Sequence, residues 1–437
     1  MPKILRIIFL LGVLTVSLIG IGARAASPTV VVLNVKGVIN PVMADYISRG
    51  IEEAENIYAT ACILQMDTPG GLDTAMRDIV QNIVNARIPV VVYVSPSGAR
   101  AASAGVFITM AAHVAAMAPN TAIGAASPVS ISAEGEAEMS ETMEEKVVND
   151  AAAYIRSIAE AHGRNMEWAE KAVREAVSAT EKEALELNVI DMVASDLDNL
   201  LSQLDGREVT MLGGMVVTLE TQSPVMEYLE MSLVEEFLFA ITDPNIAFVL
   251  LSLATLGLMV EISNPGLIFP GVVGGICLVL AFYSLGNLPV NIAGILLIAL
   301  AFGLFVAEVF TPTFGLLTAG GITALVLGSL IMFKGGPLFQ VNPWLIGGIA
   351  ICVGGVLAFI INRLIVIHRR QPYTGREELV GKTALVKAAL DPEGIVLFKG
   401  ERWTAVSGEG RVEPGEEVLI NRVDSLKLYV TKKQPDE

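Results

Sequence analysis

Ser103 has the kind of surroundings that a nucleophilic serine needs. It lies in "SGARAASAGV" (97–106), a run of small residues that follows the apolar segment "IPVVVYV". Small residues let a helix pack closely against a sheet, and they also give a substrate backbone access to a hydroxyl group. A serine nucleophile needs a neighbouring base that takes its proton. The first question is therefore which residue of the chain could be that base.

Histidine, the commonest partner of a serine nucleophile, is unpromising in this sequence. The three histidines lie in an apolar stretch, at the end of a predicted helix and after the last apolar span: His113, His162 and His368. Lysine is the alternative base, and it acts only when it is neutral, which burial beside the serine favours. Lys146 begins a predicted helix and has Asn149 and Asp150 on the same helix face. A lysine in this position is more often a solvated charge, so the sequence alone leaves both interpretations open.

Attack on a carbonyl group also requires N–H donors for the oxygen that becomes negative. The motif "DTPGG" places Gly70 and Gly71 at a strand end that leads into a helix. Without side chains there, a substrate can approach N–H groups at the start of the helix. The Ala104 N–H, which follows Ser103 at another helix start, is a further candidate donor. Two ordinary tight turns would give the same pattern.

Other kinds of chemistry find little support. The chain has no HExxH motif, no CxxC pair and no Walker loop, so we expect neither a metal nor a cofactor. The net charge of −17 argues against nucleic acid as a partner, because its phosphates require a basic surface. The three cysteines lie in apolar or strand-like runs, and we expect them to pack as small hydrophobic residues: Cys62, Cys277 and Cys352.

The elements that must position Ser103 and the glycines alternate between strands and helices. From Thr29 to about Leu204, short β-branched runs alternate with helical stretches, which predicts a parallel sheet with crossover helices. Such sheets bind ligands at the carboxyl ends of their strands, where both small-residue motifs lie. An acidic run at 133–145, just before Lys146, is either a solvated loop or a flap over the site.

The two ends of this domain, assigned to 26–205, have different characters. Residues 1–25 have a basic start, an apolar stretch and an Ala-Arg-Ala sequence, which predicts an export signal peptide, with an uncleaved anchor as the alternative. The domain is therefore expected outside the cytoplasm. Residues 206–243 are predicted to be a linker, whose amphipathic part from Val225 to Phe239 lies along a membrane surface.

The mean hydropathy of +0.60 indicates a membrane part, which we assign to 244–368. Five apolar spans are predicted there, near 244–260, 266–284, 289–310, 314–333 and 343–367. A basic cluster follows the fifth span, so the positive-inside rule places the C-terminal part in the cytoplasm. Glu261 and Glu308 fall at span ends, where we expect hydrated interfacial carboxylates.

Residues 372–437 form the last predicted domain. Five short strands separated by glycines indicate a small barrel of the oligonucleotide/oligosaccharide-binding (OB) type. The barrel type does not imply nucleic-acid binding, and we expect a module that contacts other proteins.

Three segments together resemble the protease domain of the long-form NfeD family of membrane-bound serine peptidases. They are "MDTPGGLDTAM", "SGARAASAGVFITMAAHVAAMAPNTAIGAASPV" and "KVVNDAAAYIRSIAEAHGRN". The resemblance runs essentially end to end. It implies an α/β ClpP/crotonase-like protease domain, an all-α multispanning membrane segment and a C-terminal all-β OB-type barrel. It also implies a Ser–Lys dyad of Ser103 and Lys146, with Gly70 and Gly71 in the oxyanion site.

The resemblance further implies what the protein acts on. Its substrates would be apolar peptide segments, notably of stomatin-like (SPFH) membrane proteins, cleaved in membrane protein quality control. The barrel would engage such partners, and the subunits would form a homo-oligomer. Two alternatives stay open: a crotonase-like enzyme that acts on acyl thioesters, and a non-catalytic membrane scaffold for stomatin- or flotillin-like proteins.

Overall fold

The computed structural model describes most of the chain. The described ranges are 28–128, 141–263, 266–311, 313, 315–334, 339–369 and 379–433. The predicted signal peptide at 1–25 and most of the acidic run lie outside these residues. The chain divides into two compact units at Gly354.

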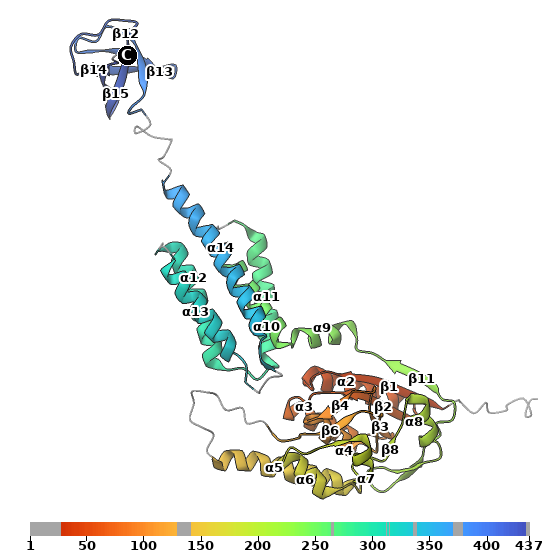
Figure 1. The fold of residues 1–437 in the computed structure, drawn as a ribbon. Helices are drawn as coiled ribbons and strands as arrows, with labels where there is room; N and C mark the ends of the chain where they lie inside the picture. The colour runs from red at the N-terminus through yellow and green to blue at the C-terminus, as the bar shows by residue number, and fades with distance from the viewer. Residues whose placement is uncertain are drawn as a thin grey trace, which may run out of the picture. The chain divides into compact units, whose positions relative to one another are not determined.

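A six-stranded sheet forms the centre of the N-terminal domain (Figure 1). Its order is β11-β1-β2-β3-β5-β8, and all its ladders are parallel. The bounds are β1 Thr29–Lys36, β2 Ala61–Asp67, β3 Val90–Val94, β5 Val114–Met117, β8 Met192–Val193 and β11 Val225–Leu229. Helices cover both faces, so the central strands are apolar along their whole length, as in the fully buried β3.

Successive side chains of β1 enter two separate cores. Val31 and Leu33 belong to the larger core, which α2 to α7 complete, and Val32 belongs to the smaller core beneath α8. The helices are α2 Pro41–Asn56, α3 Asp73–Val84, α4 Ala104–Ala111, α5 Glu141–Ala161, α6 Met166–Arg174, α7 Glu181–Glu186 and α8 Leu197–Leu204. A second sheet joins β4 Arg100–Ala102, β6 Ala122–Gly124 and β7 Ser178–Thr180.

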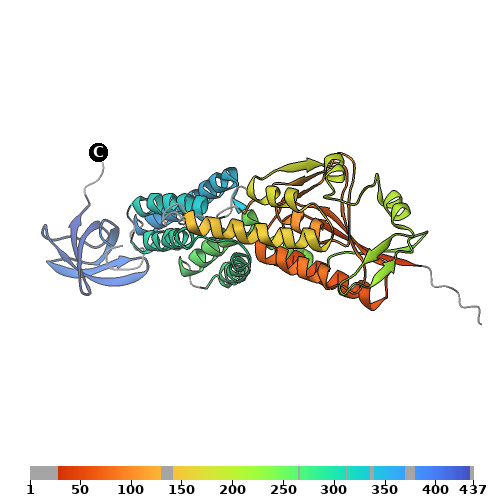
Figure 2. The ribbon, with the colours of Figure 1, turned by 90° about the horizontal axis from the view of Figure 1, so that it is seen from below.

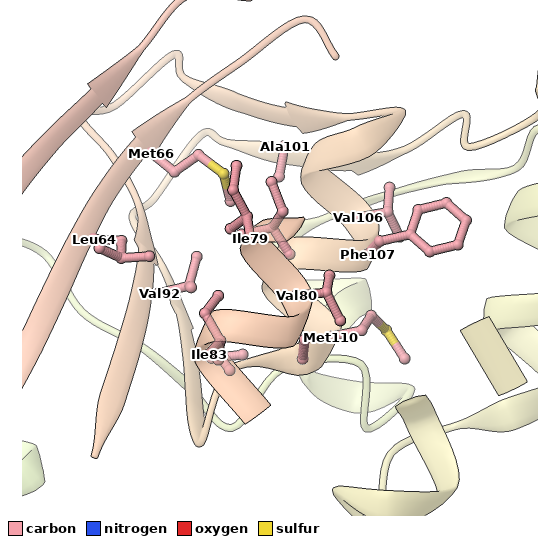
Figure 3. Packing of buried hydrophobic residues seen from close by; sticks show 14 of the residues in the cluster. Leu64, Met66, Ile79, Val80, Ile83, Val92, Ala101, Val106, Phe107 and Met110 are labelled. Carbon is pink, nitrogen blue, oxygen red and sulfur yellow. The ribbon is translucent and has the colours of Figure 1, made fainter. Parts of the chain in front are cut away.

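The short helix α4 lies inside the larger core. All eight of its residues are buried. Figure 3 shows Val106 and Met110 of α4 among the apolar side chains of α3, including Ile79 and Ile83. The core therefore fixes the start of α4, where Ser103 lies.

The segment that was predicted to be a linker contributes to the domain. It contains a hairpin, formed by the strands β9 Glu208–Thr210 and β10 Val216–Thr218, and its strand β11 pairs with β1. The first part of the segment from Val225 to Phe239, predicted to be amphipathic, is therefore an edge strand of the sheet. The apolar spacing there suits either a helix or an edge strand, and the unpaired backbone groups of β1 favour the strand. Only α9, Leu233–Ile241, is helical.

Five helices occupy the region of the predicted spans. They are α10 Pro244–Ser263, α11 Ile268–Gly286, α12 Ile292–Phe310, α13 Leu316–Ile331 and α14 Pro343–Arg369. Among the described residues, α10, α11 and α12 are long and apolar enough to cross a membrane, whereas α13 and the apolar part of α14 are shorter. Glycines allow α12 and α13 to pack closely, since a Cβ atom at Gly294 would lie 2.6 Å from the Cα atom of Met332.

Two predictions about this membrane segment are wrong. Glu308 is fully buried rather than hydrated, and its carboxylate accepts hydrogen bonds from the N–H groups of Thr313, Gly315 and Thr318. It thereby satisfies free N–H groups around the start of α13. Cys352 is exposed, while the other two cysteines are buried. A membrane helix can turn an apolar side chain toward lipid, so an apolar run there does not imply protein packing.

The C-terminal unit contains a closed barrel with strand order β12-β13-β14-β16-β15. The strands are β12 Thr383–Ala388, β13 Glu393–Phe398, β14 Glu401–Ser407, β15 Glu417–Asp424 and β16 Lys427–Lys432. Alternate residues such as Val396, Ala405 and Val430 fill its interior. The predicted fold classes are thus confirmed: an α/β domain, a helical membrane segment and an all-β OB-type barrel.

Candidate active site

Ser103 lies at a sharp bend between β4 and α4. Its backbone has φ 52° and ψ −114°, a conformation that costs a non-glycine residue about 1–3 kcal/mol. The Ser103 N–H donates to the Gly124 carbonyl oxygen at 3.2 Å. The hydroxyl makes no capping hydrogen bond to α4, although serine often caps a helix in this way. The Ser103 side chain therefore lies at the start of α4, but its hydroxyl is not used to cap the helix.

Gly70 leaves the space that Ser103 occupies. Its φ is +116°, and a Cβ atom there would lie 2.6 Å from the Ser103 Cβ atom and 3.1 Å from Oγ. Only glycine permits both this conformation and this approach. The Gly70 N–H donates to the buried Thr68 hydroxyl at 3.1 Å. Thr68, which the sequence analysis missed, therefore uses the Gly70 N–H inside the turn; its position two residues before the glycine is a turn signal.

Two other N–H groups remain free beside Ser103. Within the described residues, the N–H groups of Gly71 and Ala104 donate to no group of the protein. Ala104 is the first residue of α4, where the helix dipole makes N–H groups partly positive. At Gly71 a Cβ atom would lie 2.0 Å from the Ile39 carbonyl oxygen, so no larger residue fits.

A cavity of about 590 Å³ joins these groups to α5. Gly71, Ser103, Ala104 and Lys146 all line it, whereas Gly70 lies behind Ser103. Apolar side chains from three helices form much of its wall, among them Leu72, Met76, Phe107, Met143 and Val147. The structure therefore brings four of the five predicted site residues to one cavity, and the fifth contacts the serine.

The N-terminal end of α5 extends beyond the sheet and the other helices of its domain (Figures 1 and 2), and Lys146 is the sixth residue of this helix. The described side chains from Met143 to Val147 are exposed, and burial begins at Ala151 and Ala152. Lys146 is therefore presented to the cavity by an exposed stretch of α5, where the partly buried Val148 is the first residue that packs against the core.

Arg77 of α3 lies beside this exposed part, and the sequence analysis did not single it out. Its Nε donates to Asp73 at 2.8 Å and its Nη2 to Asp150 at 2.5 Å. Its guanidinium also lies 4.5 Å from the ring centroid of Tyr154. The spacing of Asp73 and Arg77 is visible in the sequence, but the contacts with α5 are not.

Neither His113 nor His162 lines the cavity. Burial, and then the charge of Arg164, lower the pKa of His113 to about 4, and the same two causes lower the pKa of His162 to about 4. His113 Nδ1 accepts the Val90 N–H at 3.1 Å, so this ring is a packing group. No group of three or more His, Cys, Asp or Glu side chains that could hold a metal occurs in the described part of the chain.

Family models match the three parts of the chain in order. The N-terminal domain of NfeD1b matches residues 29–210, and the NfeD integral membrane domain matches residues 245–363. The NfeD-like C-terminal, partner-binding domain matches residues 376–432.

Whole-chain relatives agree with these matches. The membrane-bound protease PH1510 of Pyrococcus horikoshii is 37% identical over 422 residues, which cover 94% of this chain and 95% of that protein. Membrane protein NfeD1b of Bacillus subtilis is 28% identical over 442 residues, 96% and 97% of the two chains. A solved lysine-to-alanine mutant of the 1510-N stomatin-specific protease, bound to a substrate peptide, is 38% identical and covers 49% of this chain and 98% of its own, with a TM-score of 0.46. The 37% identity to the Pyrococcus protease over nearly the full length of both chains, together with the three matched domains, shows that this chain belongs to the long-form NfeD family of membrane-bound proteases.

Proposed function

We propose that the protein is a membrane-anchored serine endopeptidase with a catalytic dyad of Ser103 and Lys146. The observation that supports it is the cavity that Ser103, Lys146 and two free N–H donors line together. A nucleophile, a base and an oxyanion site are the parts that acyl transfer requires.

Acylation follows from this arrangement. The Ser103 oxygen attacks the peptide carbonyl carbon, and its proton passes to the neutral amine of Lys146. The N–H groups of Gly71 and Ala104 stabilise the negative oxygen of the tetrahedral intermediate. The C–N bond then breaks, and the leaving amine takes the proton from Lys146. Gly70 enters this step through the space it leaves for Ser103, because its own N–H is bonded to Thr68.

Deacylation reuses the same groups. Lys146 accepts a proton from a water molecule whose oxygen attacks the ester carbonyl. The N–H groups again hold the oxyanion, and the ester bond breaks as Lys146 returns the proton to Ser103. Lys146 is exposed in this structure, so a bound substrate must exclude water around the amine for it to act as a base.

The substrates that fit this cavity are apolar peptide segments. Leu72, Met76 and Phe107 supply apolar surface close to Ser103, which favours an apolar side chain next to the cleaved bond. The solved relative is specific for stomatin, so we place this enzyme in membrane protein quality control with stomatin-like (SPFH) substrates. The barrel, which matches a partner-binding domain, would contact such proteins.

We propose that the protease domain lies outside the cytoplasm and rests on the membrane through α9. The exposed face of α9 carries three large apolar side chains, Leu233 85%, Val234 65% and Phe237 50% exposed, together with the exposed Glu236. Its other face is fixed to α2, where Glu235 pairs with Arg49 at 2.7 Å. The apolar helix α10 begins three residues after α9 ends, so a bilayer is the surface that covers this face. The C-terminal barrel would then lie in the cytoplasm, and subunits would associate as a homo-oligomer.

The dyad is tested with the full-length protein in lipid nanodiscs and a fluorogenic peptide that carries an apolar segment. We expect Ser103→Ala and Lys146→Ala each to lower kcat by at least about 10³-fold. Lys182→Ala, at a lysine of α7, is the matched control and should cleave at the wild-type rate. Wild-type cleavage by either dyad variant would refute the dyad. Hydrolysis of an acyl thioester but not of the peptide would favour the acyl-thioester alternative, and binding of a stomatin-like protein without any cleavage would favour the scaffold.

A further inference from the structure

Lys146 reaches the cavity from a part of α5 that has little packing of its own. The side chains of residues 143–147 are exposed, Val148 is only partly buried against the core, and the fully buried face of α5 starts at Ala151. A lysine on such a helix end needs a further anchor if its amine is to stay within reach of Ser103. A misplacement of about 1 Å can lower an enzymatic rate by about 10²-fold.

The pair of Arg77 and Asp150 lies at the point where this anchor is needed. Asp150 follows Lys146 by four residues, so the two side chains lie on the same face of α5. Arg77 donates to Asp150 at 2.5 Å and is itself held by Asp73 on its own helix at 2.8 Å. The guanidinium therefore connects α3 to the turn of α5 that follows Lys146.

Aromatic contacts continue this connection to the helix of Ser103. The Arg77 guanidinium lies 4.5 Å from the Tyr154 ring centroid, and the Tyr154 ring stacks on Phe107 with centroids 6.0 Å apart. Phe107 is a buried residue of α4, one turn after Ser103. A continuous set of contacts thus runs from the helix of the serine, through Tyr154 and Arg77, to the turn that carries the lysine.

We propose that Arg77 is a positioning residue that, through Asp150, holds Lys146 in reach of Ser103. This inference rests on the proposed dyad. The charged side chains that line the cavity with Lys146 are Asp73 and Arg77 from α3 and Asp150 from α5. Glu144 and Glu145 precede Lys146 on α5 but do not line the cavity.

The positioning role has its own signature in kinetics. Loss of positioning lowers kcat in both Arg77→Ala and Asp150→Asn, and we expect a fall of about 10-fold or more with a smaller change in KM.

The experiment measures kcat and KM for these variants in the full-length protein in nanodiscs. The matched control is Arg156→Ala, because Arg156 also joins α5 to a neighbouring helix, through Glu170 at 3.1 Å, but does not line the cavity. The double variant Arg77→Ala/Asp150→Asn should lose no more activity than the worse single variant, because both act through one contact. Equal melting temperatures would separate positioning from unfolding, as expected for a partly exposed ion pair.

The failures of the two proposals are distinguishable. If Ser103→Ala still cleaves at the wild-type rate, the proposed function is wrong. If Ser103→Ala is inactive but Arg77→Ala and Asp150→Asn keep kcat within about twofold, the dyad stands and the positioning role is refuted.

Discussion

The two helices that carry Ser103 and Lys146 are held in opposite ways. All residues of α4 are buried, and Ser103 is fixed at its start by a strained backbone and by Gly70. The first turns of α5 are exposed, and Lys146 depends on contacts at the helix surface. The core therefore fixes Ser103, the proposed nucleophile, while in our proposal an ion pair positions Lys146, the proposed base. Changes near Ser103 should affect stability and activity together, whereas changes near Lys146 should affect activity alone.

The largest effect is expected where the serine and Gly70 meet. Gly70→Ala would place a Cβ atom 2.6 Å from that of Ser103 at a φ of +116°, so either the turn or the serine must move. We expect kcat to fall by more than about 10²-fold in the peptide assay. Gly98→Ala is the control, because Gly98 also has a positive φ, +91°, but open space around it. If both variants cleave equally well, the close approach at Gly70 has no catalytic meaning.

A pair of valine substitutions tests the contrast between the helices directly. Val106 is fully buried in α4, so Val106→Ala should lower the stability of the protease domain by about 1–3 kcal/mol, and activity with it. Val147 is 41% exposed and lines the cavity, so Val147→Ala should change stability by less than about 0.5 kcal/mol. It should still weaken cleavage of apolar peptides several-fold. Thermal unfolding and KM measurements decide, and a destabilised Val147→Ala protein would contradict the contrast.

Part of the pH dependence of stability is expected to come from His162, whose pKa is lowered mainly by burial. The pKa of His162 is lowered to about 4 by burial and by Arg164 and His113, so the unfolded chain binds a proton at this residue at a higher pH than the folded protein does. The contribution of His162 is therefore fully present above about pH 6.5 and is lost as the pH falls toward 4. His162→Phe keeps an aromatic ring beside His113. In this variant the free energy of unfolding should fall less on acidification than in the wild type, by about 2 kcal/mol or less. Identical slopes in thermal unfolding between pH 7 and 4.5 would rule this out.

The smallest effect concerns the membrane contact of α9 and is spectroscopic. In a Cys352→Ser background, a fluorophore attached at Phe237→Cys should be quenched by lipids that carry nitroxide groups near the headgroup. The control is the same label at Leu187→Cys, an exposed apolar position at the end of α7. Equal quenching at the two positions would mean that α9 does not lie on the bilayer.

The sequence predicts the local parts of this molecule better than the contacts between distant ones. Short motifs place Ser103, Gly70 and Gly71 at strand ends because backbone geometry there demands small residues. Lys146 is favoured only by resemblance to a family, since its own surroundings in the sequence are those of a solvated charge. Arg77 was missed because its partner Asp150 lies 73 residues away and no local pattern joins them.

The edge strand of the sheet and the burial of a carboxylate in the membrane segment were also hard to predict. The apolar spacing of β11 suits both a helix and an edge strand, and only the open edge of β1 decides between them. Glu308 looked like an interfacial carboxylate, yet the N–H groups at the start of α13 provide enough hydrogen bonds to bury it. In both cases the deciding partner lies outside the window that a local pattern covers.

The dyad is tested most directly by trapping the acyl-enzyme. An active ester with an apolar acyl group is mixed with the full-length protein, and the adduct is located by mass spectrometry of the intact chain and of its peptides. We expect one acyl group on Ser103, none in Ser103→Ala, and at least about 10²-fold slower acylation in Lys146→Ala. Acylation of another residue, or of Ser103 at an unchanged rate without Lys146, would contradict the dyad.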